Sequence, residues 1–224
     1  MGVIASARDL LRATRMRRPP DFFELRLDAL RNSLQEIERA IPRLSAPLIL
    51  TARHPAEGGA GHLHLSARRK LILQFLDHAT MVDLELRSLP QMQSLLHEMR
   101  RRQIGLLLSK HFLDDTPSPG KLHQFVRSAL PSKPTILKLA ARTDQPAQLE
   151  RLVSFFLERP CPETPLAAMG MGKFGLESRL QLDRLGSALT YFAFSEAGIQ
   201  GQPSLTRLRR LRNAYNKKDP LRDA

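Results

Sequence analysis

The sequence contains little that would direct the chain out of the cell or into a membrane. Its 224 residues include one cysteine, Cys161, so no internal disulfide can form and no second thiol is available for a metal site. No apolar run is long enough to span a bilayer, and the first residues lack the apolar core of a signal peptide. We therefore expect a cytoplasmic protein with no membrane partner, folded as a single domain over residues 1–224.

Aromatic side chains that could stack on nucleic-acid bases are also scarce. The chain has no tryptophan and two tyrosines, although its formal net charge is +13. Its densest basic runs, at 15–20, 99–103 and 207–218, are dispersed along the chain, whereas nucleic-acid binding usually needs one concentrated basic face. We expect solvated basic surfaces that attract an anionic small molecule, and no nucleic-acid partner.

Motifs for common cofactors are missing as well. The sequence has no G-x-G-x-x-G after its first apolar run and no G-x-x-x-x-G-K-[ST], which argues against dinucleotide and P-loop phosphate chemistry. His62 and His64 form an H-x-H pair, but no third metal ligand is indicated nearby. We expect a protein without cofactor or metal.

Short apolar runs alternate with amphipathic helical segments along the whole chain. Eight strand–helix units predict an α/β protein with a (β/α)8 TIM barrel, for which about 200–250 residues suffice. An open doubly wound sheet is the alternative. A C-terminal helix and a basic tail are expected over 206–224. The eight apolar runs are 2–6, 22–27, 47–52, 81–86, 104–109, 134–140, 165–169 and 188–194.

One lysine, Lys138, lies inside the apolar run 134–141. Burial disfavours an ammonium and lowers its pKa, which makes the amine a nucleophile toward carbonyl groups. A Schiff-base lysine is therefore one interpretation. The other is a lysine at a strand end whose amine reaches water.

Charged residues recur at every second position near the ends of several predicted strands. Residues two apart on a strand point to the same side, and both faces of a barrel strand are buried, so these rows must pair across the lumen or line a polar pocket. Barrel enzymes assemble their active sites at these strand ends, which favours a pocket, with a structural ion-pair network, above all for Asp83 and Arg87, as the alternative. The rows are Glu24, Arg26 and Asp28; Thr51 and Arg53; Asp83, Glu85 and Arg87; and Ser109 and His111.

These residues belong to motifs that resemble the type I 3-dehydroquinate dehydratases, in the order and approximate spacing of that family. The resemblance extends over nearly the whole chain. The motifs are FELRLD (23–28), LTARHPAEGG (50–59), VDLEL (82–86), LLSKHF (107–112), LKLAART (137–143), MGMGKFGLESR (169–179), GSALTY (186–191) and GQPS (201–204).

The resemblance implies a barrel that dehydrates 3-dehydroquinate to 3-dehydroshikimate in the shikimate pathway through an imine. Lys138 would form the imine, and His111, with an ordinary pKa of about 6.5, would move protons. Glu57 would orient the histidine. The resemblance further implies a homodimer.

The resemblance also implies a set of substrate-binding residues. Arg179 would bind the substrate carboxylate, and the loop 195–204 would act as a lid that excludes water. The complete predicted set of substrate-binding residues is Glu24, Arg26, Arg53, Arg179, Gln202 and Ser6.

Several positions depart from the family pattern. Gly198 lies where a lid serine is usual, Tyr191 replaces a phenylalanine, and Arg142 replaces a common methionine. If Arg142 pointed toward Lys138, it would lower the pKa of the amine further. Because the chain begins directly at its first predicted strand, we expect the barrel to lack the usual N-terminal hairpin.

Two other function classes fit parts of the sequence. Another Schiff-base barrel enzyme, such as an aldolase, would use the same lysine on a different carbonyl compound. An inactive barrel could act as a basic binding protein, for which the net charge of +13 is the main support. Such a protein would bind nucleic acid with a steep salt dependence and form no imine.

Overall fold

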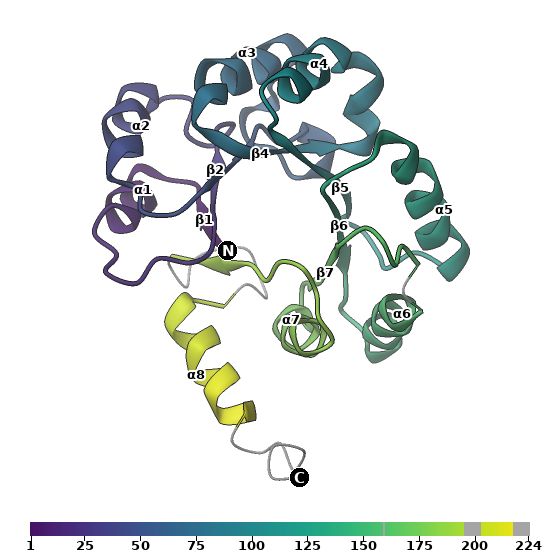
Figure 1. The fold of residues 1–224 in the computed structure, drawn as a ribbon. Helices are drawn as coiled ribbons and strands as arrows, with labels where there is room; N and C mark the ends of the chain where they lie inside the picture. The colour runs from purple at the N-terminus through teal and green to yellow at the C-terminus, as the bar shows by residue number, and fades with distance from the viewer. Residues whose placement is uncertain (159, 195–202, 217–224) are drawn as a thin grey trace.

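Eight parallel strands form one sheet that curls into a ring, with helices around its outside (Figure 1). The computed structural model describes residues 1–158, 160–194 and 203–216. The predicted (β/α)8 barrel is confirmed, and the open sheet is excluded. The strands are β1 (Gly2–Ile4), β2 (Phe23–Arg26), β3 (Leu48–Thr51), β4 (Ala79–Glu85), β5 (Gly105–Phe112), β6 (Ile136–Arg142), β7 (Leu166–Met171) and β8 (Phe192–Ala193).

Helices follow the strands and cover the outer face of the sheet (Figure 1). On α5, for example, the apolar stripe of Leu122, Phe125, Val126 and Ala129 is buried against the barrel, as an amphipathic helix requires. No helix within the described residues is both long and apolar enough to cross a bilayer. The helices are α1 (Ala7–Ala13), α2 (Leu34–Ala40), α3 (Leu65–Phe75), α4 (Gln93–Arg101), α5 (Pro119–Ala129), α6 (Pro146–Leu157), α7 (Gly175–Arg184) and α8 (Leu205–Asn216).

Single turns of 3-10 helix connect several of these elements. Two of them matter for the site. The first, η2, carries Glu57. The second, η5, begins directly after β4 and ends the alternation of inward and outward side chains along that strand. The 3-10 helices are η1 (Ile41–Arg43), η2 (Pro55–Glu57), η3 (Ala60–His62), η4 (Leu76–His78), η5 (Leu86–Gln91) and η6 (Leu130–Ser132).

The side chains inside the ring separate into an apolar and a polar part along the strands. Ile49, Met81 and Leu107 belong to an apolar cluster inside the barrel. Two residues further along each strand, the same face carries Thr51, Asp83 and Ser109, all buried. The strand register therefore collects polar groups toward the carboxyl ends of the strands, where barrel enzymes have their active sites.

The ring closes between β7 and β8 without a regular ladder, since these two strands form the ends of the sheet order. The segment before β8 closes it instead. Ala188 N donates to Leu166 O at 2.9 Å, and Ala168 N donates to Ser187 Oγ at 3.0 Å. The predicted strand 188–194 thus contributes only Phe192–Ala193 as regular strand, paired with β1.

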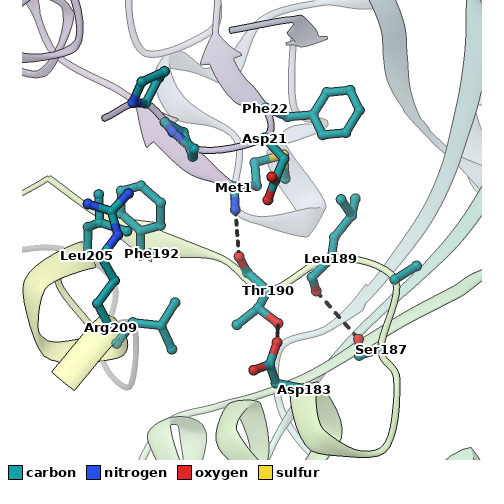
Figure 2. A pocket seen from close by; sticks show the side chains of 14 residues that line it. Met1, Asp21, Phe22, Asp183, Ser187, Leu189, Thr190, Phe192, Leu205 and Arg209 are labelled. Carbon is teal, nitrogen blue, oxygen red and sulfur yellow. Dashed lines mark hydrogen bonds between the residues drawn. The ribbon is translucent and has the colours of Figure 1, made fainter. Parts of the chain in front are cut away.

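A cavity of about 380 Å³ lies at the opposite, amino-terminal end of the strands, between the start of β1 and α8 (Figure 2). The amino group of Met1 donates to Thr190 O at 2.8 Å, and the Thr190 hydroxyl donates to Asp183 at 2.6 Å. Although this cavity is the larger of the two described here, it lies away from the strand ends where the polar rows converge.

Candidate active site

A second cavity, of about 240 Å³, opens at the carboxyl ends of the strands. We call it the strand-end pocket. Seven of the nine residues predicted from the sequence line it, although they come from six different segments of the chain. These seven are Glu24, Arg26, Arg53, Glu57, His111, Lys138 and Arg179.

Lys138 lies at the centre of this pocket, on β6. Its side chain is 3 % exposed, so the alternative of an amine that reaches bulk water at a strand end is wrong. Its Nζ donates to Asp83 Oδ2 at 2.9 Å and lies 3.9 Å from Glu24 Oε1. Burial lowers the pKa of the amine, while Asp83 and Glu24 oppose the shift. The result is a buried amine that loses its proton more easily than a free lysine.

The ring of Tyr191 covers the amine from another side. Lys138 Nζ lies 4.3 Å from the ring centroid, within the range of a cation–π contact. Tyr191 lies just before β8. From the sequence it was noted only as a tyrosine at a position where the family usually has phenylalanine. The structure brings it into the pocket lining.

Glu57 and His111 form a second pair of groups in the pocket. Glu57 Oε2 accepts hydrogen bonds from both the backbone N and the ring Nδ1 of His111, at 2.9 and 3.0 Å. Burial, reinforced by the charges of Arg53 and Lys138, holds the pKa of His111 well below its ordinary value. The imidazole is therefore neutral at neutral pH. With Nδ1 donating to the carboxylate, Nε2 is left as a proton acceptor.

Local backbone chemistry explains how Glu57 reaches the histidine. His54 caps η2 through its Nδ1, which accepts from Ala56 N at 3.0 Å, and Pro55 supplies the first turn. Gly58 then adopts a left-handed conformation with φ of 85°, which glycine permits at little cost. Burial raises the pKa of Glu57, and the Lys110 amine, 3.6 Å from its Oε1, opposes this shift.

Arg53 links the acids around the lysine. Its guanidinium donates to both carboxylate oxygens of Asp83, at 3.0 and 2.6 Å, to Glu85 at 3.1 Å and to Ser109 at 2.8 Å. These acids hold the pKa of Arg53 well above its ordinary value, against the effect of burial. With its donors directed at these groups, Arg53 fixes the carboxylate that accepts from Lys138.

Arg179 lies on α7 and is 4 % exposed. Burial lowers its pKa to about 10. The glycines of the MGMGKFG turn bring this helix close to β7, because a Cβ on Gly170 would overlap Ser178 Oγ and Thr143 Oγ1. Ser178 Oγ instead accepts from Gly170 N at 2.8 Å, which anchors the first turns of α7 beside the pocket.

Comparison with known proteins places the chain in a family. A model of the type I 3-dehydroquinase family matches residues 4–219. The chain belongs to the type I 3-dehydroquinases. This confirms both the resemblance drawn from the motifs and the predicted enzyme class, a lyase.

Individual relatives agree with this assignment. A 3-dehydroquinate dehydratase of Dehalococcoides mccartyi is 29 % identical over 202 residues, which cover 87 % of this chain and 86 % of that protein. One from Latilactobacillus sakei is 29 % identical over 214 residues, with 91 % and 87 % covered. The crystal structure of the Clostridium difficile enzyme, modified covalently by comenic acid, superposes with a TM-score of 0.85 at 20 % identity, covering 97 % of this chain and 92 % of that one. The Enterococcus faecalis enzyme gives a TM-score of 0.80 at 25 % identity, with 97 % and 93 % covered.

The two remaining residues expected at a type I 3-dehydroquinase site, Ser6 and Gln202, have different outcomes. Ser6 is exposed and caps α1, where its Oγ accepts from Asp9 N at 3.1 Å. Gln202 lies outside the described residues, as do Gly198 and most of the predicted lid. Ser6 therefore supports a helix end, while the roles predicted for Gln202 and Gly198 stay predictions.

Two arginines near the strand ends differ from the alternatives considered from the sequence. Asp83 belongs to a buried ion-pair network with Arg53 and Lys138, whereas Arg87 is exposed and lies outside that network. The chain enters η5 at Leu86, which ends the two-residue alternation before Arg87. Arg142 is half-exposed and donates to Asp144 at 2.6 Å, so it does not adopt the orientation toward Lys138 that would have lowered the pKa of the amine further.

The sequence analysis missed Arg68, which is 1 % exposed on α3. Its guanidinium donates to Ala52 O at 2.7 Å, to Ser88 Oγ at 3.2 Å and to Glu85 Oε2. A signal was present, because Arg68 lies three and four positions before Leu71 and Ile72, on the apolar face of the helix. Through Glu85, Arg68 supports Arg53 and hence the carboxylate beside Lys138.

Proposed function

We propose that this type I 3-dehydroquinase converts 3-dehydroquinate to 3-dehydroshikimate through an imine between the Lys138 amine and the ketone of the substrate. The observation that carries the proposal is the position of Lys138. Its amine is buried inside the ring with a lowered pKa, in the same pocket as the Glu57–His111 pair and Arg179. The 3-dehydroquinate dehydratases among its relatives carry this substrate in their names.

Imine formation needs the neutral amine. Burial favours this form. Arg53 and Lys138 hold the pKa of Asp83 far below its ordinary value, so Asp83 stays a carboxylate that orients the amine, with Nζ at 2.9 Å, and the proton that the ammonium releases passes to water. The amine then adds to the substrate carbonyl, and water leaves as the carbon–nitrogen double bond forms. The resulting iminium attracts electrons more strongly than the ketone did, which acidifies the neighbouring carbon.

His111 supplies the base for the next step. Its neutral ring, held through Nδ1 by Glu57, can accept the proton from the carbon next to the iminium and leave an enamine. The enamine electrons then expel the hydroxyl on the following carbon. The proton held by His111 goes to this hydroxyl, which departs as water. Hydrolysis of the new imine releases the enone product and restores the Lys138 amine.

Charge complementarity supports the choice of a carboxylated substrate. Burial lowers the pKa of Arg179, so a carboxylate bound beside it would stabilise its charged form. Glu24 and Arg26, on neighbouring positions of the same β2 face, offer an acceptor and donors for ring hydroxyls. Arg26 is itself positioned by Asp28, with distances of 3.0 and 2.8 Å.

The reaction is tested by comparing wild type with Lys138→Ala and with Lys133→Ala, a matched change at an exposed lysine just before β6. Formation of the conjugated enone from 3-dehydroquinate is followed by ultraviolet absorbance. We expect turnover in wild type and Lys133→Ala and none in Lys138→Ala.

Borohydride trapping then identifies the atom that reacts. Reduction in the presence of 3-dehydroquinate should add the mass of the ligand to the peptide that contains Lys138, and mass spectrometry reads this directly. Turnover in Lys138→Ala, or trapping at a different lysine, would refute the mechanism. Trapping by another carbonyl compound, without conversion of 3-dehydroquinate, would assign the imine to a different reaction such as an aldol cleavage.

A further inference from the structure

The hydroxyl of Tyr191 is a polar group that the proposed mechanism leaves unused. Tyr191 is 4 % exposed and lines the strand-end pocket. Among the residues that the structure describes, its buried Oη has no hydrogen-bond partner. Buried tyrosine hydroxyls usually find a partner, because burying one without a partner costs free energy. The pocket therefore contains a hydrogen-bonding position that the protein itself leaves open.

The surroundings of this hydroxyl define what it can bind. Its ring covers the Lys138 amine, with Nζ 4.3 Å from the centroid, so the tyrosine borders the space that a ligand attached to that amine would occupy. Burial, together with Glu24 and Asp83, holds the pKa of Tyr191 well above its ordinary value. The group is therefore protonated throughout the physiological range and can donate a hydrogen bond.

Arg179 supplies the positive charge that would hold an anionic acceptor in this pocket. Arg179 and Tyr191 both line the strand-end pocket, and both are buried. An anion held by the Arg179 guanidinium would lie close to the phenol and would offer it a charged acceptor. A charged acceptor forms a stronger hydrogen bond than a neutral one.

We propose that the Tyr191 hydroxyl donates a hydrogen bond to the carboxylate of the bound substrate and so acts with Arg179 as a substrate-binding residue. This inference rests on the proposed function, which supplies the carboxylated cyclic ketone. The acceptor completes the hydrogen bonding of a phenol that has no partner in the part of the free enzyme that the structure describes. Tyr191 thereby favours ligands that carry a carboxylate over those that lack it.

Tyr191→Phe removes the hydroxyl and keeps the ring over the lysine. Loss of a hydrogen bond to a charged group corresponds to roughly 10- to 100-fold weaker binding. Since the contact exists in the bound substrate and in the transition state alike, KM should rise by about this factor while kcat stays within about threefold. Tyr215→Phe makes the same change at the other tyrosine of the chain and serves as the control, for which we expect both constants to be unchanged.

A thermal melt of the free enzyme separates this role from a structural one. Because the hydroxyl is buried without a partner, Tyr191→Phe should keep or raise the wild-type Tm in the absence of ligand. A structural role for the hydroxyl would lower the Tm. The stabilisation that 3-dehydroshikimate gives to wild type should in turn be smaller in Tyr191→Phe.

A ligand without the carboxylate locates the contact. For a cyclic hydroxyketone that lacks this group, borohydride trapping at Lys138 should proceed at the same rate in wild type and Tyr191→Phe. If wild type converts 3-dehydroquinate and Tyr191→Phe matches its KM, this inference fails and the dehydratase function stands. If the variant loses affinity equally for both ligands, the hydroxyl does not contact the carboxylate and the inference fails. If wild type neither converts 3-dehydroquinate nor forms the adduct, both proposals fail.

Discussion

Replacing Arg68 by methionine should destabilise the enzyme although Arg68 does not line the pocket. Methionine keeps the length of the apolar stem but removes the guanidinium, which donates to Glu85, Ala52 and Ser88. Breaking a buried ion pair on one side costs about 3–5 kcal/mol, because it leaves a buried charge behind. Glu85 keeps Arg53 at 3.1 Å, the hydroxyl of Ser88 at 2.9 Å and the backbone of His54 at 2.9 Å. We therefore expect the lower end of this range, about 3 kcal/mol.

Differential scanning calorimetry converts this cost into a measurable shift. For a chain of this size each kcal/mol lowers Tm by about 2–4 °C, so Arg68→Met should melt about 6–12 °C below wild type. The neighbouring Arg69 is exposed and offers a matched control, since Arg69→Met should change stability by no more than about 0.5 kcal/mol. If the two variants melt at the same temperature, the reasoning about the buried guanidinium is wrong.

Three further results are expected. The folded enzyme holds His111 neutral while the unfolded chain protonates it below its ordinary pKa of about 6.5, so unfolding free energy should fall as pH drops below that value. Denaturant titrations at several pH values should show that the unfolding free energy of His111→Gln depends less steeply on pH than that of wild type, by up to about 1.4 kcal/mol per pH unit. His97→Gln changes an exposed histidine, and the same pH dependence in both variants would contradict this. Arg142→Met should leave the pH profile of imine trapping unchanged, because Arg142 pairs with Asp144, and a shifted profile would show that its charge reaches Lys138. Sedimentation should give twice the chain mass of 25.3 kDa if the expected homodimer forms, and a single-chain mass would exclude it.

The barrel and the centre of its site were predictable because both follow from short-range periodicity. The apolar run 134–141 indicated a strand and so favoured burial of Lys138, and the two-residue spacing placed Asp83 and Glu85 on one face of their strand. The barrel then brings together residues as far apart in sequence as Glu24 and Lys138, whose charged atoms lie 3.9 Å apart.

The sequence was less informative where a strand ends, and where the usual exposure of a residue type was given more weight than the residue's position on its helix. Arg87 continues the two-residue alternation in the sequence, but η5 begins at Leu86, and the side chain of Arg87 is exposed. Arg142 has the same parity as Lys138, yet at the strand end it reaches Asp144 instead. Arg68 was not singled out from the sequence, because arginine is rarely buried, although its position on α3 indicated the inner face.

The way the ring closes has a consequence for where the barrel opens locally. Between β7 and β8 the joint depends on Ser187 and Ala188 rather than on a continuous ladder, so the amides of Ala168 and Ala188 should exchange with solvent sooner than those inside the other strand pairs. Arg179 follows β7 and Tyr191 precedes β8, so the two residues belong to the two sides of this closure. A carboxylate bound by both residues would connect the two sides. Substrate binding should therefore slow deuterium uptake at the β7–β8 closure more than anywhere else around the barrel.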